Sequence, residues 1–259
     1  MLRIKNIEKT FNKGTENELH IFDDFNLEIK DGSITALLGA NGCGKSTLLN
    51  LISGSMDVDA GEIELGDVKL SSLKEHERAP YIAKVHQNPT AGVSPSLTIL
   101  ENMSLADKKG SKFSLKKLVD IKKKARYKEM LIPLELNLEN KMDVKAQYLS
   151  GGQRQAMSLI LTTLRKPELL LLDEHTAALD PKTSRLIMEK TIEIARKQKI
   201  TTVMISHNLR DALRYSDRII LLHKGKVILD VAPSEISEAE LVNIFNRENQ
   251  EEEMQLMAV

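Results

Sequence analysis

Short apolar segments of strand length recur through the first third of the chain. In each of them apolar residues alternate with polar ones or run together, and polar or glycine-containing stretches bound them. This pattern predicts β-strands. The segments are LRIKNI at 2–7, FNLEI at 25–29, ITALLG at 34–39 and GEIEL at 61–65. The first convincing helical segment, GKSTLLNLIS at 44–53, follows the third of them.

The last third of the chain returns to the same alternation. Apolar runs at 168–174, 199–207 and 217–230 predict further strands, and residues 181–198 read as a helix between the first two. Strands that alternate with helices are typical of α/β domains built on a parallel sheet. We therefore predict an α/β fold.

The middle of the chain differs from both flanks. NPTAGVSPS at 88–96 has the composition of a loop, and a mostly helical stretch rich in lysine follows to about Gln147. A new helix is predicted over 150–166, because Ser150 is a suitable N-cap and basic residues stand in its last turn. The middle segment therefore reads as a helical insertion.

We expect a single domain over residues 1–259. The predicted divisions are an α/β core with a β subdomain at 1–88 and 156–235, a helical subdomain at 89–155, and a C-terminal helix with an acidic tail at 236–259.

The lysine-rich stretch has two interpretations. Residues 108–128 include ten Lys or Arg, and Asp120 is their only acidic neighbour within the segment. Such a run could face an anionic membrane surface. Charge runs are more often the solvated face of surface helices, and we favour that reading.

Composition narrows the class of protein. The 37 basic residues are balanced by 37 acidic ones, whereas nucleic-acid-binding domains usually carry a basic excess, so we expect no nucleic-acid partner. A single Cys excludes a disulfide framework and points to a reducing compartment. No apolar run approaches the roughly 20 residues of a membrane helix, and no signal-peptide stretch opens the chain. We expect the chain to reach a membrane only through partners.

One glycine-rich loop predicts a phosphate site. GANGCGKS at 39–46 fits G-x-x-x-x-G-K-[ST], after a predicted strand and before a predicted helix. Backbone N–H groups of such a loop wrap phosphates, and the helix N-terminus adds partial positive charge. Lys45 is predicted to reach the β- and γ-phosphates, and Ser46 to bind Mg²⁺. The other predicted nucleotide contacts here are Gly39, Asn41, Gly42, Cys43, Gly44 and Thr47.

A second segment, LLLLDE, predicts the other half of a magnesium site. Its four leucines indicate a buried strand, and ligands bind at the carboxyl ends of strands in open α/β sheets. Asp173 is predicted to hold Mg²⁺, and Glu174 to polarise the attacking water. An apolar run that ends in Asp-Glu is weak evidence alone, but it gains weight behind a phosphate loop.

A second predicted helix start with glycines, LSGGQRQ, lies at residues 149–155. A protein that binds one nucleotide in one phosphate loop does not need a second one. The order of motifs along this chain resembles that of ABC-type ATPases: GANGCGKST, VHQNP, LSGGQRQ, LLLLDE, AALD and MISHN. The chain resembles that family over nearly its whole length, from the aromatic residue of KTFNKG to about Pro233. LSGGQ is the most specific of these motifs, because other phosphate-loop ATPases lack it.

The resemblance implies a P-loop NTPase fold, with a RecA-like parallel sheet core, an antiparallel β subdomain and an inserted α-helical signature subdomain. It implies ATP and Mg²⁺ as cofactors. In the family, the signature residues face the γ-phosphate that a second copy holds, so that two ATP molecules are sandwiched in a homodimer. The positions that match the signature are Ser150, Gly151, Gly152 and Gln153.

Further roles carry over from the family at single positions. Phe11 resembles the aromatic residue that stacks on adenine, and Gln87 resembles the glutamine that senses Mg²⁺ and the attacking water. His207 is expected to contact the γ-phosphate and to hold Glu174 in position. Asp180 is expected to cross the dimer interface beside the partner's phosphate loop.

The segment after the acidic pair departs from the family pattern. His175 stands where the family usually has proline, and Ala177 replaces a usual serine or other small polar residue. An imidazole beside Glu174 could make turnover sensitive to pH near its reference pKa of ~6.5. The alternative, which we favour, is a neutral replacement.

The leading hypothesis is an ATP-hydrolysing subunit that energises an ABC membrane transporter. The segments LLDEHTAALDPKT and ITALLGANGCGKST resemble stand-alone ATPases of bacterial importers that take up small nutrients such as amino acids. The resemblance implies separate transmembrane permease subunits, a substrate-binding protein and a location at the cytoplasmic face of the membrane. The alternative is a soluble, non-transport ABC ATPase with an assembly or remodelling role. A scaffold without turnover is disfavoured, because every predicted catalytic position is occupied.

Overall fold

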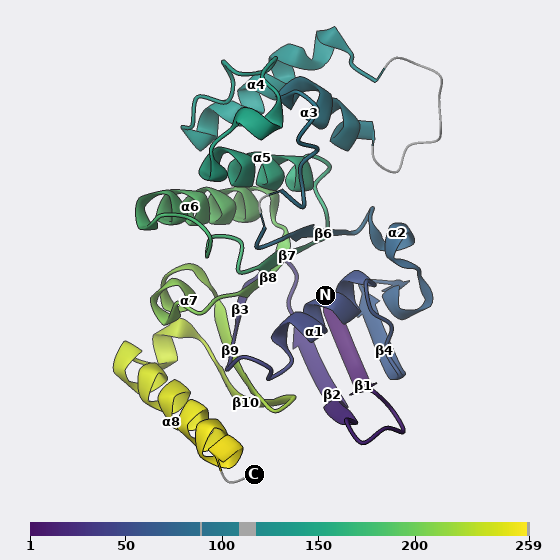
Figure 1. The fold of residues 1–259 in the computed structure, drawn as a ribbon, viewed down its shortest axis with the longest axis vertical. Helices are drawn as coiled ribbons and strands as arrows, with labels where there is room; N and C mark the ends of the chain where they lie inside the picture. Colours follow the sequence, from purple (N-terminus) through teal and green to yellow (C-terminus); the bar gives the residue numbers. More distant parts are fainter. Residues whose placement is uncertain (89, 109–117, 258–259) are drawn as a thin grey trace. The chain divides into compact units, whose positions relative to one another are not determined.

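The computed structural model describes residues 1–88, 90–108 and 118–257, with side chains to residue 248 (Figure 1). The chain forms two compact units, which we describe separately. Unit 1 comprises Met1–Arg78 and Thr201–Val259, and unit 2 comprises Ala79–Ile200.

Unit 1 contains an antiparallel sheet with the strand order β2-β1-β4-β5. Apolar residues at alternate positions of β1 and β4 pair across the strands, as in Leu2 with Leu65 and Ile4 with Ile63, and all four are buried. Because side chains alternate between the faces of a strand, this register places one apolar face against the core. The strands are β1 (Leu2–Phe11), β2 (Leu19–Ile29), β4 (Ala60–Leu65) and β5 (Val68–Lys69).

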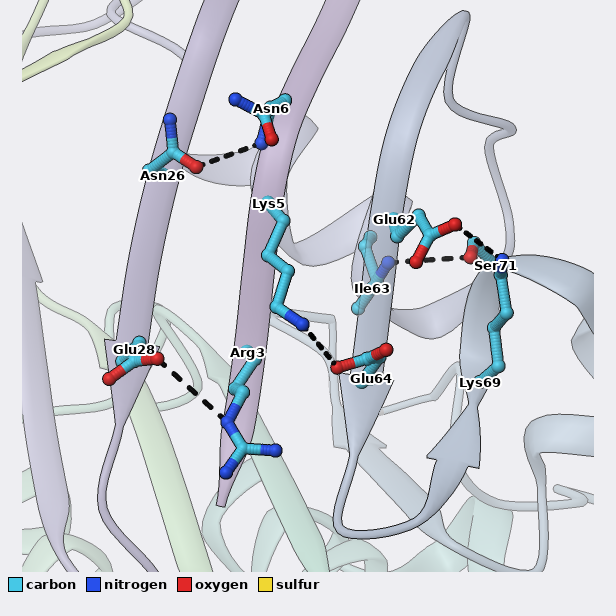
Figure 2. Close-up of polar contacts among 10 residues, drawn as sticks. All are labelled: Arg3, Lys5, Asn6, Asn26, Glu28, Glu62, Ile63, Glu64, Lys69 and Ser71. Atoms are coloured by element: carbon cyan, nitrogen blue, oxygen red, sulfur yellow. Dashed lines mark hydrogen bonds and ion pairs between the residues drawn. The ribbon is translucent and has the colours of Figure 1, made fainter.

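Charged side chains pair across the same strands (Figure 2). Lys5 Nζ lies 2.9 Å from Glu64 Oε2, and Arg3 Nε lies 3.8 Å from Glu28 Oε1. Arg3 and Glu28 face each other in the register, whereas Lys5 faces Glu62 and reaches Glu64 diagonally. Such pairs of opposite charge contribute modestly to sheet stability.

A second sheet in unit 1 carries the phosphate loop. Strand β3 (Ile34–Leu38) lies between β8 (Thr201–Ile205) and β9 (Arg218–His223) and is parallel to both, while β10 (Lys226–Val231) pairs antiparallel with β9. Every residue of β3 and β8 is buried, as expected for central strands of a parallel sheet. The helices of unit 1 are α1 (Lys45–Ser53), α2 (Glu75–Arg78), α7 (Leu209–Tyr215) and α8 (Glu238–Met257), with short 3₁₀ turns at Leu70–Ser72 and Pro233–Glu235.

The C-terminal end of α1 is closed by a buried arginine. Arg78 is 3% exposed, and its Nη1 donates to the carbonyl oxygens of Leu51 and Ile52 at 2.7 and 3.0 Å. Its Nε donates to the carbonyl of Leu73 at 3.0 Å. A cation at this end of a helix interacts favourably with the helix dipole. Burial lowers the pKa of Arg78, yet guanidinium is effectively always protonated in proteins.

Unit 2 combines two parallel strands with a helical cluster. β6 (Ile82–Val85) pairs with β7 (Leu169–Asp173), and Figure 1 shows α5 (Gly151–Thr163) and α6 (Pro181–Gln198) side by side. A contiguous apolar core joins α5 to the preceding helical segments, which include the buried Met103 and Tyr127. Those segments are α3 (Ile99–Lys108), α4 (Lys124–Leu131) and 3₁₀ turns at Ile121–Lys123, Ile132–Leu134 and Ala146–Tyr148.

Candidate functional site

The phosphate loop of unit 1, residues 39–47, connects β3 to α1. Lys45 opens α1, and its buried ammonium Nζ donates to the carbonyl oxygens of Gly39 and Ala40 at 2.7 and 2.6 Å. The cation is therefore held inside the curve of the loop. Gly44, the N-cap of α1, has a φ of 108° and accepts from Leu48 N at 2.8 Å.

Two glycines of the loop are required for different reasons. Gly39 has a φ of +148°, and a Cβ there would lie 2.4 Å from the Leu222 carbonyl oxygen and 2.5 Å from Cys43 Sγ. Gly42 has a φ of +85°, but a Cβ there would meet nothing within 4 Å. Gly39 is therefore fixed by close packing as well as by its backbone angle, whereas Gly42 is fixed by the angle alone.

The loop is also supported from outside its own motif. The backbone N–H of Gly225, in the turn between β9 and β10, donates to the Cys43 carbonyl at 3.1 Å. A Cβ at Gly225 would lie 1.8 Å from the Ile21 carbonyl oxygen, and one at Gly44 would lie 2.9 Å from Phe22 Cζ. These supports are separated in sequence from the motif, so no local sequence pattern marks them.

Other predicted nucleotide contacts of unit 1 are accessible. Because β3 and β8 are parallel, with Leu37 opposite Ile205, the phosphate loop and His207 follow strand ends at the same edge of the sheet. Phe11 is the last residue of β1, and Lys9 Nζ lies 5.8 Å from the centroid of the Phe11 ring. The exposed or half-exposed positions are Phe11, Asn41, Ser46, Thr47 and His207.

In unit 2 the predicted acidic pair stands at the end of β7. Asp173 is the last residue of the strand, and Glu174 follows it with a φ of +46°, which is uncommon for a residue with a Cβ. Lys84 of β6, whose strand partner is Leu171, places its Nζ 3.4 Å from Asp173 Oδ2. No sequence motif marks this lysine, because only the strand register brings it to the carboxylate.

His175 belongs to unit 2 and is 1% exposed. Its Nε2 lies 3.1 Å from the hydroxyl of Thr191, on α6. Burial lowers the pKa of His175 to about 4. The imidazole is therefore neutral across the range in which a sensor with a pKa near ~6.5 would titrate, which favours the neutral replacement over pH sensitivity at this position.

The signature segment begins α5 as predicted. Ser150 is the N-cap, and its Oγ accepts from Gln153 N at 3.2 Å. The Gln153 side chain accepts in return from Ser150 N at 3.2 Å, which completes a capping box. Gln153 Nε2 also donates to the Leu136 carbonyl at 3.0 Å. Ser150 itself is exposed, so the helix start is ordered and open to a ligand.

A second helix start packs beside the first. Asp180 is the N-cap of α6, and its Oδ1 accepts from Thr183 N at 3.0 Å. Hydrogen bonds from the side chain and then the backbone of Thr183 lower the pKa of the Asp180 carboxyl. A Cβ at Gly152 would lie 2.4 Å from Thr183 Cγ2, whereas one at Gly151 would come no closer than 3.8 Å to Leu179. Gly152 therefore permits the close approach of the two helix starts.

Gln87 follows β6 and is exposed. The residue before it is bound to the signature helix, because Gln155 Nε2 donates to the His86 carbonyl at 3.3 Å. Gln155 is fully buried, and its Oε1 has no hydrogen-bond partner within the described residues. The contact connects the segment that carries Gln87 with α5.

The lysine-rich stretch is described only in part, since residues 109–117 lie outside the described residues. In the remainder, Lys123 Nζ lies 2.5 Å from Asp107 and Lys124 Nζ lies 2.8 Å from Asp143. These ion pairs agree with a solvated surface for that part.

The oxygen donors predicted for Mg²⁺ are a serine hydroxyl, a carboxylate and a glutamine amide, from Ser46, Asp173 and Gln87. All three donor types suit this hard cation. Across the described parts of the chain, no group of three or more His, Cys, Asp or Glu side chains could hold a metal by itself. The roles assigned to individual residues from the sequence stay predictions.

No helix within the described ranges combines the length and the apolar composition needed to cross a membrane.

Comparison with known proteins gives matches over most of the chain. A sequence profile described as "ABC transporter" matches residues 22–177. The chain is 46% identical over 240 residues to a tyrosine transport ATP-binding protein of Clostridioides difficile, which covers 91% of this chain and 93% of that protein. It is 33% identical to the spermidine/putrescine import ATP-binding protein PotA of Haemophilus influenzae, with 95% of this chain and 61% of PotA covered.

Solved structures agree with these matches. The dimeric post-hydrolysis structure of the ATP-binding cassette MJ0796 with ADP and Pi superposes with a TM-score of 0.76 at 30% identity, covering 90% of this chain and 99% of that one. The ADP conformation of the cassette MJ1267 gives a TM-score of 0.76 at 25% identity, with 95% and 94% covered. The predicted α/β fold of the P-loop NTPase class is confirmed.

Proposed function

Because the chain belongs to the ABC transporter family of ATP-binding subunits, we propose that it energises a bacterial importer of a small nutrient such as an amino acid. The chain is an ATPase of that family. The observation that carries the importer proposal is the 46% identity to a tyrosine transport ATP-binding protein, which extends over 91% of the chain.

The phosphate loop is proposed to hold the ATP phosphates. Its backbone turns through positive φ angles at Gly39, Gly42 and Gly44 and leads into the start of α1, where helix N–H groups attract anions. Lys45 is already held inside the loop by two carbonyl oxygens, so the cation is in place before negative charge arrives. We propose that Phe11 stacks on adenine.

Glu174 is proposed to orient and polarise the attacking water, and His207 to contact the γ-phosphate. Mg²⁺, held by Ser46, Asp173 and Gln87, would neutralise charge on the phosphate oxygens. The ion pair with Lys84 fixes the Asp173 carboxylate at the end of β7.

The signature segment is proposed to bind the γ-phosphate of ATP held by a second copy. The N-termini of two helices lie side by side here, at Ser150 and Asp180. The N-terminus of a helix attracts anions through its N–H groups and the helix dipole. The accessible anion site at Ser150 would then bind the triphosphate that the second copy holds. ATP would thereby join the two copies, and hydrolysis would release them.

The partners outside the homodimer follow from the importer proposal. We propose separate transmembrane permease subunits, a substrate-binding protein in the same system, and a peripheral position at the cytoplasmic face of the membrane.

The dimer can be tested with variants that preserve the fold. Glu174→Gln should bind ATP, lose turnover by orders of magnitude and accumulate as a dimer in MgATP, measured by light scattering. Within that background, Ser150→Asp keeps an N-capping side chain but adds negative charge opposite phosphate, so the dimer should be lost. Ser150→Asn is the matched control, because it caps equally well without the charge. A dimer of equal strength in Ser150→Asp, or normal turnover by Glu174→Gln, would contradict the assignment.

The transport role needs its own experiment. The tagged chain should co-purify from membranes with permease subunits, and the complex in liposomes should take up tyrosine when ATP and the binding protein are supplied. Spermidine is the comparison substrate, because a relative is named for it. ATP hydrolysis that no membrane partner stimulates would argue against an importer.

A further inference from the structure

A buried side-chain contact anchors the loop that carries Glu174 to α6. His175 Nε2 and Thr191 Oγ1 lie 3.1 Å apart, and both residues are almost fully buried. Thr191 lies ten residues beyond Pro181, which places it roughly 15 Å along α6 from the helix start. The helix therefore holds the loop near Glu174 as well as at Asp180, where the loop ends.

The direction of this hydrogen bond follows from the second partner of the threonine. Thr191 Oγ1 lies 2.7 Å from the Ile187 carbonyl oxygen, which can only accept. The single hydroxyl proton is used there, so Thr191 accepts from His175, and the imidazole carries its proton on Nε2. Nδ1 is then unprotonated, and it has no partner in the described part of the chain. The bond to Thr191 is the only hydrogen bond found for this ring in that part.

The backbone at Glu174 needs such an anchor. A non-glycine residue with a φ of +46° is strained and persists only where its surroundings hold it. A proline at position 175 would supply rigidity but no donor, and it would restrict the preceding residue. Histidine removes that restriction and replaces it with a hydrogen bond to α6.

We propose that His175 is a positioning residue, whose Nε2–H bond to Thr191 fixes the backbone of Glu174 and so aligns its carboxylate for hydrolysis. This inference rests on the role proposed above for Glu174. Small displacements of a catalytic group reduce the rate of the chemical step, so loss of the bond should lower kcat and leave ATP binding unchanged.

The test compares two buried threonines on neighbouring helices. Thr163 of α5 is 2% exposed, and like Thr191 it donates to the carbonyl four residues earlier, here at 2.8 Å. Within the described residues, however, its hydroxyl has no imidazole partner. Thr191→Val should lower kcat roughly tenfold with KM for ATP changed by less than about twofold. Thr163→Val should lose similar stability but keep its kcat, and Thr191→Ser should restore kcat.

A double-mutant cycle separates the bond from general packing. In a His175→Leu background, Thr191→Val should have no further effect on kcat, because the pair acts as a unit. Long-range ¹H–¹⁵N NMR should assign the proton of His175 to Nε2. Equal kcat values for Thr191→Val and Thr163→Val, multiplicative effects in the cycle, or a proton on Nδ1 would overturn the inference. Normal turnover by Glu174→Gln would instead refute the proposed function.

Discussion

Replacing Gly39 with alanine separates backbone strain from steric clash in the phosphate loop. The new Cβ would lie 2.4 Å from the Leu222 carbonyl oxygen, which belongs to β9, and 2.5 Å from Cys43 Sγ. Residues Arg218–Leu221 of β9 pair with β3, and Leu222 pairs with Val227 of β10, so a shift of that carbonyl would disturb the sheet beside the loop. The φ of +148° adds strain that alanine cannot avoid.

Two effects contribute to the expected loss of folding free energy in Gly39→Ala. A left-handed backbone angle costs a residue with a Cβ about 1–2 kcal/mol, and overpacking costs about 1–3 kcal/mol. Gly39→Ala should therefore lower the free energy of unfolding by roughly 2–5 kcal/mol. Gly42→Ala is the matched control, because its φ of +85° imposes strain while its Cβ would meet nothing within 4 Å. It should lose only about 1–2 kcal/mol.

Urea unfolding without nucleotide measures both variants, and equal slopes would justify comparing their free energies. Adding Cys43→Ala to Gly39→Ala should recover only part of the loss, since the clash with the Leu222 carbonyl persists. Equal destabilisation by Gly39→Ala and Gly42→Ala would refute the role of close packing.

Three further outcomes follow from other contacts. Arg78→Met should lower the free energy of unfolding by about 2–4 kcal/mol in urea titrations, because three carbonyl oxygens lose a charged donor; a change within about 0.5 kcal/mol would contradict this. The hydrogen-bonded ion pair with Arg218 lowers the pKa of Asp230 in the folded protein. The contribution of this pair to folding stability is therefore fully present above the usual aspartate pKa of ~3.9, and it is lost as pH falls through the lowered pKa. Asp230→Asn should therefore flatten the acid limb of a stability–pH curve, and an unchanged limb would count against the pair. Cys43 is 2% exposed, so maleimide should label it slowly, MgATP should slow labelling further, and labelled protein should lose ATPase activity; full activity after complete labelling would remove Cys43 from the site.

Local chemistry explains what the sequence could predict. The start of α5 was predicted from Ser150, and the capping box confirms it. The buried runs that became β3, β7 and β8 were predicted because central parallel strands are apolar on both faces. β6 was not predicted, since four residues give too short a pattern.

Contacts between distant residues could not be predicted from local pattern. Lys84 reaches Asp173 only through the register of β6 and β7. The lowered pKa of His175 comes from its burial, which its sequence neighbours do not specify. Position 175 could be singled out from the sequence as unusual, but its hydrogen bond needed the structure.

The turn between β9 and β10 carries a consequence for genetic variation. Gly225 donates to the phosphate loop and leaves no room for a side chain beside Ile21. In a saturation library scored by growth on the transported nutrient, substitutions at 225 should be depleted as strongly as those at Gly39. A scan limited to recognised motifs would overlook that position, although harmful variants should gather there.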